Sequence, residues 1–120
     1  MSDLALGKKG EEIAKKYLSK HNYKIVERNF KSQRWGEIDL VAIENEVLVF
    51  VEVKTRLGSK YGEPQEAVTP FKLRALKRTG TYYKMQHPEL PEALRIDVVA
   101  IVLDRKTHEP LKIELFRDAR

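Results

Sequence analysis

Two carboxylates and a lysine lie in a pair of apolar segments that is expected to form a hairpin. Asp39 belongs to a predicted strand at 37–43, and Glu52 and Lys54 belong to a predicted strand at 46–54. Carboxylate and water ligands suit Mg²⁺ or Mn²⁺, and no His or Cys stands beside them to favour zinc. A bound metal would stabilise charge on a phosphoryl group and lower the pKa of a bound water, while the lysine would orient that water. The chemistry that this set predicts is hydrolysis of a phosphodiester bond.

Strand alternation places these charged residues on one face of the hairpin. A two-residue turn at 44–45 sets Asp39 opposite Phe50. In the same register Glu37 lies opposite Glu52, so that three carboxylates come within about 5–8 Å of one another at the backbone. The alternative is a ladder of surface ion pairs on an exposed face. Apolar residues on both faces favour a covered sheet, whose core side is expected to carry Ile38, Leu40, Ala42, Val47, Val49, Val51 and Val53.

The elements that must hold this hairpin predict a single α/β domain over residues 1–120. An apolar stripe at helical spacing predicts a helix at about 4–20. Thr69 and Pro70 have the types expected of an N-cap and a first helical residue, and their helix is expected to reach about Met85. Strands are predicted at 23–30, 37–43, 46–54, 94–103 and 111–116. The order is α-β-β-β-α-β-β, which indicates a mixed β-sheet flanked by helices.

Several residues outside the hairpin have predicted places in the packing. Gly7 and Gly10 lie on the apolar stripe of the first helix, where close approach to another element would compensate for their unfavourable helix propensity. Glu11 lies at the edge of the same stripe. Arg95 and Asp97 open a buried strand and are expected to pair with each other. In the second helix the residues expected to face inward are Phe71, Ala75, Leu76, Thr79, Tyr82 and Tyr83.

Composition and charge limit the classes of protein. The 120 residues include 23 Lys and Arg against 18 Asp and Glu, a net charge of +5, and no cysteine. The missing cysteine excludes disulfide staples, thiol nucleophiles and Cys-based zinc sites. The most apolar stretch, 47–53, contains Glu52 and is far too short to cross a bilayer. No apolar run follows the N-terminal lysines, so we expect a cytoplasmic protein without a membrane partner.

Two motifs carry a resemblance to a known superfamily. Gly-Glu-Ile-Asp-Leu-Val-Ala (36–42) followed by Val-Phe-Val-Glu-Val-Lys-Thr-Arg (49–56) resembles the core of the PD-(D/E)xK nucleases. Within that superfamily the chain is similar to the YraN family of predicted endonucleases, small relatives of the archaeal Holliday-junction resolvases. The chain departs from the superfamily pattern at Ile38, where proline is usual. The likeness extends over nearly the whole chain and includes the segments 7–11, 61–64 and 95–99.

The resemblance implies a restriction-endonuclease-like fold and a set of site residues. Asp39 and Glu52 would bind Mg²⁺ or Mn²⁺, and Lys54 would be the catalytic lysine. Glu11 would add a carboxylate from the first helix. Junction resolvases work as dimers because two strands must be cut, so the resemblance also implies a homodimer.

Basic residues flank the hairpin in the sequence and suit contacts with DNA phosphates. They are Lys31, Arg34, Arg56, Lys60 and Lys72, with Trp35 available to stack on a base. Ordinary solvated charge is the alternative for these residues, and Lys72 would equally well extend to water. Glu37 and Gln65 are candidates for a supporting role around the metal ligands.

The function that we expect is metal-dependent hydrolysis of DNA, with branched or recombination intermediates as substrates by analogy with junction resolvases. One alternative is a nucleic-acid-binding module of the same fold that cleaves little or not at all and serves DNA repair, recombination or uptake. A second alternative is an interaction protein without a nucleic-acid role, which would not bind DNA even at low salt.

Overall fold

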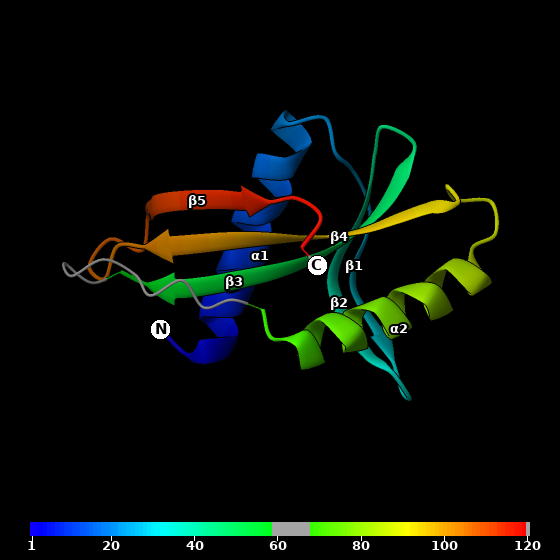
Figure 1. Cartoon of the computed structure of the whole chain (residues 1–120). Helices are drawn as coiled ribbons and strands as arrows, with labels where there is room; N and C mark the ends of the chain where they lie inside the picture. Colours follow the sequence, from blue (N-terminus) through cyan, green and yellow to red (C-terminus); the bar gives the residue numbers. More distant parts are fainter. Residues whose placement is uncertain (59–67, 120) are drawn as a thin grey trace.

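A computed structural model describes residues 1–58 and 68–119 of the chain. It contains two helices and five strands in that part, in the order predicted from the sequence (Figure 1). The elements are α1 (Asp3–Lys20), β1 (Lys24–Ser32), β2 (Gly36–Glu44), β3 (Val47–Leu57), α2 (Pro70–Gln86), β4 (Ala93–Leu103) and β5 (Pro110–Phe116). The predicted α/β class and the α-β-β-β-α-β-β order are therefore confirmed.

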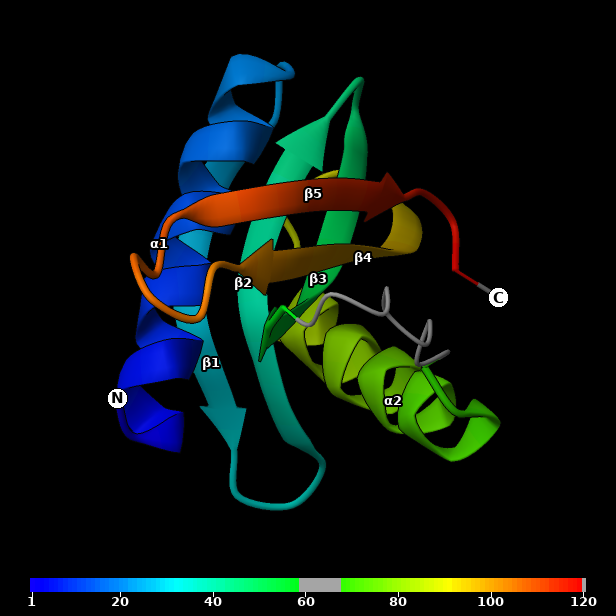
Figure 2. The ribbon, with the colours of Figure 1, turned by 90° about the vertical axis from the view of Figure 1, so that its left-hand side faces the viewer.

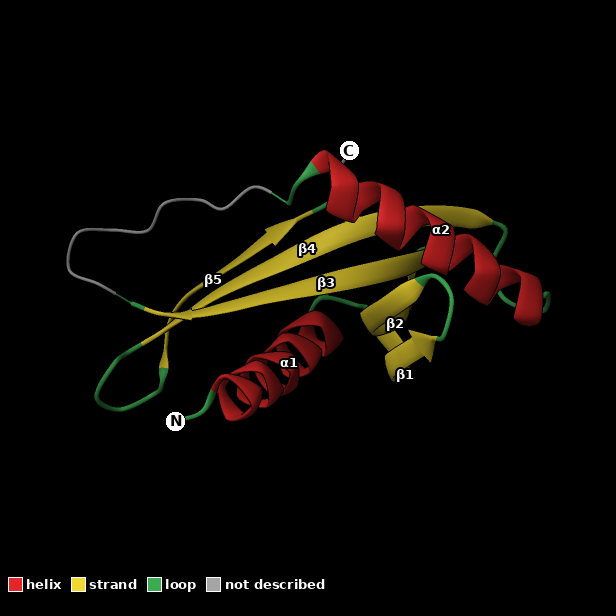
Figure 3. Cartoon of the chain, turned by 90° about the horizontal axis from the view of Figure 1, so that it is seen from below, coloured by secondary structure: helices red, strands yellow, loops and turns green. Residues whose placement is uncertain are grey.

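The five strands form one mixed sheet in the order β1-β2-β3-β4-β5. Neighbouring strands are antiparallel except β3 and β4, which are parallel and are connected through α2. The sheet is strongly twisted, so that β4 and β5 run steeply across the direction of β1 and β2 (Figure 2). The two helices lie on opposite sides of β3 and β4 (Figure 3). Neither helix is long and apolar enough to cross a membrane in the part of the chain described.

Each helix covers its own hydrophobic cluster, and β3 contributes to both. Under α1, Leu18 is fully buried together with Leu40 and Val49. Under α2, Tyr83 is buried together with Phe50. A strand that is buried on both faces reads as a continuous apolar run, which is the pattern of β3. The charged residues at the end of β3 therefore lie in a covered sheet, as expected, and not on an open face.

Ile38 departs from the predicted core face. It was expected beside Leu40, but it is fully buried in the cluster under α2, where Phe30 also packs. Phe30 is its partner across the β1–β2 ladder. Asn29, the residue before Phe30 in β1, has a left-handed φ of 54°, and the β1–β2 ladder has an irregularity between Ile25 and Glu27.

Two glycines allow the helices to approach β3 closely. A Cβ on Gly10 of α1 would overlap the side chain of Thr55, and a Cβ on Gly80 of α2 would lie 2.5 Å from the ring of Phe50. The close approach predicted for Gly10 is confirmed. Gly7 has open space around it, so the same prediction was wrong there. Both contacts lie on the strand that also carries Glu52.

The β2–β3 turn lies one residue later than predicted. Glu44 pairs with Val47, and the two turn residues are Asn45 and Glu46, with φ of 51° and 64°. Two consecutive left-handed residues are the signature of a type I′ turn, which matches the twist of a hairpin. Glu44 stays in β2 because its carboxylate is paired with Arg95 of β4, at 2.8 Å.

The face of α2 that packs on the sheet differs from the predicted face at Phe71. Leu76, Thr79 and Tyr83 are buried as predicted, but Phe71 is 68% exposed. At about 100° per residue, Phe71 lies about 140° around the helix from Leu76, whereas Lys72 lies only about 40° from it. The first turn of α2 therefore presents Lys72 towards the sheet and Phe71 to solvent. Thr69 is the N-cap as predicted, and its hydroxyl accepts from the Lys72 backbone N–H at 3.1 Å.

Candidate active site

Asp39 and Glu52 lie side by side where β2 and β3 separate. The last pair of the ladder is Leu40 with Val51, and Asp39 follows immediately beyond it. Its Oδ2 accepts a hydrogen bond from the backbone N–H of Val53, at 2.8 Å. The predicted pairing of Asp39 with Phe50 is therefore corrected. The register moved by two positions with the turn, which kept Asp39 on the same face as Glu52 and brought the two residues next to each other.

The two carboxyl groups lie so close that the negative charge of Glu52 disfavours ionisation of Asp39. Glu52 is only 7% exposed. Burial is the largest cause that raises the pKa of Asp39, to about 7, and a side-chain hydrogen bond with Glu52 and the charge of Glu52 raise it further. The Val53 N–H and the charge of Lys72 lower it. Near neutral pH this pair holds a proton that a bound cation would displace.

Lys72 of α2 lies against this pair. Its Nζ is 3.3 Å from Oε2 of Glu52, and its side chain is 41% exposed. Sequence reasoning left Lys72 open between phosphate and water, and the structure places it at the carboxylates. The ammonium of Lys72 thus reaches the site from the side of the sheet that α2 covers. The exposed part of the same side chain faces solvent.

Lys54 lies two residues after Glu52 in β3, on the same face by strand alternation. It is half-buried and pairs with Ala100 across the parallel ladder. Its side chain makes no hydrogen bond or ion pair in the part of the chain described. The ammonium is therefore not committed to a protein partner there, unlike that of Lys72.

Glu11 of α1 lies close enough to Asp39 to feel its charge. Burial and then the charge of Asp39 raise the pKa of Glu11, while a side-chain hydrogen bond with Asn29 lowers it. The close approach of α1 at Gly10 brings Glu11 into the field of Asp39. Among residues 1–58 and 68–119, no three Asp, Glu or His side chains gather closely enough to hold a metal ion. The inner pair is Asp39 and Glu52, and a ligand role for Glu11 stays a prediction.

The donor set fits Mg²⁺ or Mn²⁺. The adjacent carboxyl groups of half-buried Asp39 and buried Glu52 present hard oxygen ligands, which these ions prefer. Their mutual repulsion is visible in the raised pKa of Asp39. A divalent cation would relieve that repulsion more completely than the single charge of Lys72.

Glu37 is not opposite Glu52. It lies beyond the β2–β3 ladder, is exposed, and pairs with Lys31 of β1. The two-position change of register is the reason. The charge of Glu37 still contributes to raising the pKa of Glu11, so it acts on the site at longer range.

The predicted DNA contacts fall into separate places. Lys31 and Arg34 are exposed at the β1–β2 turn, and Trp35 is half-buried there. Arg56 is half-buried in β3, opposite Val102. Lys60 and Gln65 lie outside the described residues. The turn residues therefore form a group apart from the carboxylates, whereas Lys72 lies at Glu52.

Sequence reasoning missed the basic surface of α2. Between Pro70 and Gln86 the helix has no Asp or Glu, and its cations are Lys72, Arg74, Lys77, Arg78 and Lys84. Arg78 lies over the ring of Trp35, with its Cζ 5.9 Å from the ring centre. The absence of any acidic residue in seventeen helical positions was the signal that pointed to a surface for anions.

Comparison with known proteins identifies relatives along the whole chain. The profile of the uncharacterised protein family UPF0102 matches residues 10–101. A UPF0102 protein of Geobacter metallireducens is 47% identical over 97 residues, covering 81% of this chain and 79% of the relative. Those of Rhodococcus opacus and Caldicellulosiruptor saccharolyticus are 44% identical over 118 residues and 41% over 119, covering 98% and 99% of this chain and 97% and 99% of the relatives. The chain belongs to the uncharacterised protein family UPF0102.

Proposed function

We propose that this protein is a metal-dependent endonuclease that hydrolyses phosphodiester bonds in DNA. The observation that carries the proposal is the pair of adjacent carboxyl groups of Asp39, which is half-buried, and Glu52, which is buried. Two carboxyl groups this close, whose charge is offset only in part by the single charge of Lys72, are typical of a functional site. Two lysines beside them, Lys54 and Lys72, supply positive charge where a phosphate would bind.

Asp39 and Glu52 would hold Mg²⁺ or Mn²⁺, with Glu11 as a further carboxylate. When bound, the ion supplies charge neutralisation at the phosphoryl oxygens and lowers the pKa of a water molecule. The backbone N–H of Val53 fixes the orientation of Asp39 through Oδ2. That hydrogen bond holds the carboxyl group of Asp39 beside that of Glu52.

The two lysines have different tasks in this proposal. Lys54 has no protein partner in the described part of the chain, so its ammonium is free to hold the attacking water or a phosphoryl oxygen by hydrogen bonds. Lys72 is paired with Glu52 at 3.3 Å. A cation on the carboxylates would release Lys72, and its ammonium would then contact a phosphate that enters beside α2.

DNA is preferred over RNA by analogy with the junction resolvases, and branched or recombination intermediates are the first substrates to test. One observation favours the alternative of a binding module with little cleavage. Lys72 already neutralises part of the carboxylate charge, so the fold does not depend on a metal for its local charge balance. Such a module would serve DNA repair, recombination or uptake.

The test is a panel of linear, single-stranded, flapped and four-way DNA substrates incubated with Mg²⁺, Mn²⁺ or EDTA. We expect cutting that requires the metal, is lost in Asp39→Asn, and persists in Glu46→Gln, a change at an exposed turn residue. Binding without cutting on every substrate would support the binding module instead. Equal cutting by Asp39→Asn would contradict the assigned site.

A further inference from the structure

A groove lies between the β1–β2 turn and the second half of α2. Its volume is about 950 Å³. Its cationic and aromatic lining includes Lys31, Arg34 and Trp35 from the turn and Lys77, Arg78 and Tyr82 from α2. In the sequence these two groups are more than forty residues apart, and the fold brings them to face each other.

The groove combines positive charge with aromatic surface. Among the described residues that line it there are four cationic side chains and no Asp or Glu. The guanidinium of Arg34 lies 4.9 Å from the ring centre of Trp35, and that of Arg78 lies 5.9 Å from it. Charge of one sign around an aromatic ring is complementary to an anion that carries a flat ring of its own.

The turn that carries Trp35 is fixed by hydrogen bonds. The hydroxyl of Thr79 in α2 donates to the backbone oxygen of Trp35 at 2.9 Å. The hydroxyl of Ser32 accepts from the backbone N–H of Trp35 at 3.1 Å. The backbone that carries the indole is thus held in place before any ligand arrives, so ordering the turn adds little to the entropy lost on binding.

We propose that this groove binds an unpaired nucleobase and its flanking phosphates, so that the segment of DNA beside the active site is single-stranded. This rests on the proposed function, because it names the form of DNA that the carboxylate site would receive. A base stacked on Trp35 takes the place of one guanidinium, which then pairs with a phosphate. Stacking accepts any base, so the groove selects unpaired strand and not sequence.

The groove and the carboxylates are close enough to share one strand of DNA. Arg78 is six residues after Lys72 in α2, which is about 9 Å along the helix axis. Trp35 precedes Asp39 by four residues, which is about 13 Å along an extended strand. A base in a duplex is covered by its neighbours and cannot reach the indole, whereas a base in a flap or gap can.

Trp35 is itself the probe, because it is the only tryptophan in the chain. In EDTA, which prevents cutting, a short oligothymidylate should quench its fluorescence saturably, and the binding should weaken as salt rises. A blunt hairpin duplex of the same nucleotide number should quench it much less. Equal quenching by the duplex, or no quenching by the oligothymidylate at low salt, would overturn the proposal.

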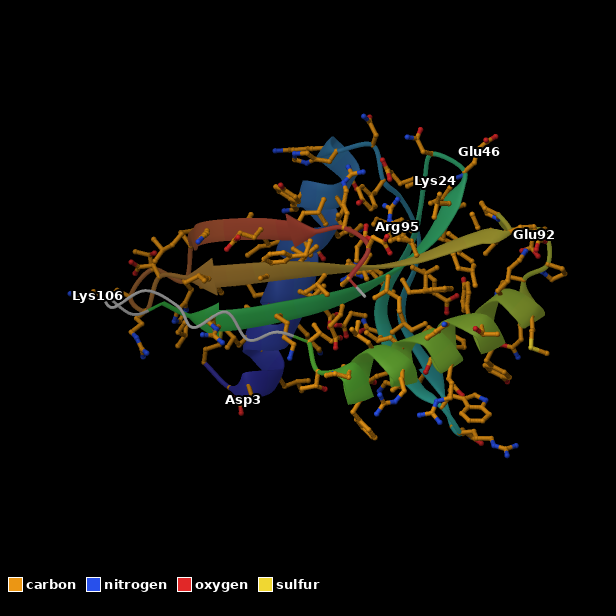
Figure 4. All side chains as sticks on the ribbon, viewed as in Figure 1. Asp3, Lys24, Glu46, Glu92, Arg95 and Lys106 are labelled. Atoms are coloured by element: carbon orange, nitrogen blue, oxygen red, sulfur yellow. The ribbon has the colours of Figure 1, made fainter. Side chains whose placement is uncertain are left out.

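Variants then test the two kinds of contact, with a dye-labelled oligothymidylate followed by anisotropy. Trp35→Ala should weaken binding about 5- to 150-fold, the range that corresponds to loss of one stacked base, and Trp35→Phe should restore part of it. Lys77→Gln should reduce the salt dependence by about one counterion. Lys106→Gln removes the same charge at the far end of the molecule from α2 (Figure 4) and should change neither quantity. Unchanged affinity in folded Trp35→Ala would refute the groove.

The two proposals can fail separately. If the wild type cuts DNA while Trp35→Ala and Lys77→Gln bind it normally, the groove is wrong and the nuclease stands. If oligothymidylate quenches Trp35 as described but no substrate is cut with any metal, the nuclease is wrong and the groove stands. Asp39→Asn should quench like the wild type, since Asp39 is not in the groove.

Discussion

Replacing Asp39 by asparagine should make the metal-free protein more stable. Asp39→Asn keeps the size of the side chain and an oxygen that accepts from Val53, but it removes the charge that Glu52 opposes. The change therefore eliminates the unfavourable interaction and preserves the favourable one. A loss of function that comes with a gain in stability is the behaviour expected of a site kept for chemistry.

The magnitude follows from the pKa of Asp39. It is raised from 3.8 in the unfolded chain to about 7 in the folded protein, first by burial and then by Glu52. The folded state binds the proton more tightly, so this contribution to stability is present below pH 3.8 and is lost as the pH rises through 7. A pKa difference of about 3 corresponds to at most about 4 kcal/mol at 1.36 kcal/mol per pKa unit.

Asp39→Asn should accordingly gain up to about 4 kcal/mol at pH 8, and less than half of that at pH 5, where wild-type Asp39 is mostly protonated in the folded state. Urea unfolding in EDTA at both pH values measures the gain. Glu46→Gln is the matched control, because it removes one exposed carboxylate at the turn and should shift stability by no more than about 0.5 kcal/mol.

A gain that is equal at pH 5 and pH 8 would refute the reasoning, since the effect would then not depend on the proton. A loss of stability in Asp39→Asn at pH 8 would refute it as well. That result would mean that the ionised carboxylate is favourable in the fold and that Lys72 more than offsets the repulsion from Glu52.

Three further changes test the packing and the charges. Gly80→Ala places a methyl group against the ring of Phe50 and should cost about 1–3 kcal/mol in urea unfolding; a gain would contradict the close helix–sheet contact. Arg95→Met leaves the fully buried Asp97 without its 2.8 Å partner and should cost about 3–5 kcal/mol by thermal unfolding; a neutral result would contradict the network. Lys72→Met should raise the pKa of Asp39 in a carboxyl NMR titration, because the Lys72 charge lowers it; an unchanged pKa would contradict the ion pair.

Strand alternation predicted the shared face of the site correctly, even though the turn was misplaced. Glu44 has the composition of a turn residue, and nothing near it in the sequence shows that its carboxylate will pair with Arg95, fifty-one residues away. The error moved the register by two positions. Because strand faces repeat every two residues, Asp39 and Glu52 remained on one face and came closer together.

The contributions of the helices were harder to predict. Thr69 and Pro70 located the start of α2, and the helical period then set Lys72 towards the sheet. The contact of Lys72 with Glu52 depends on how closely α2 packs on the sheet. Gly80 permits this close packing because a Cβ at that position would overlap the ring of Phe50. The groove beside Trp35 depends on the hydrogen bond from Thr79, a residue that the apolar pattern indicated only as core.

The most direct test of the central claim is Mn²⁺ binding measured by electron paramagnetic resonance on the purified full chain. We expect one Mn²⁺ per chain that Mg²⁺ displaces, with affinity lost in Asp39→Asn and in Glu52→Gln and retained in Glu46→Gln. Both loss-of-charge variants should remain folded by circular dichroism. Undiminished binding in folded Asp39→Asn, or no binding by the wild type at millimolar Mn²⁺, would contradict the assignment of Asp39 and Glu52 as a metal site.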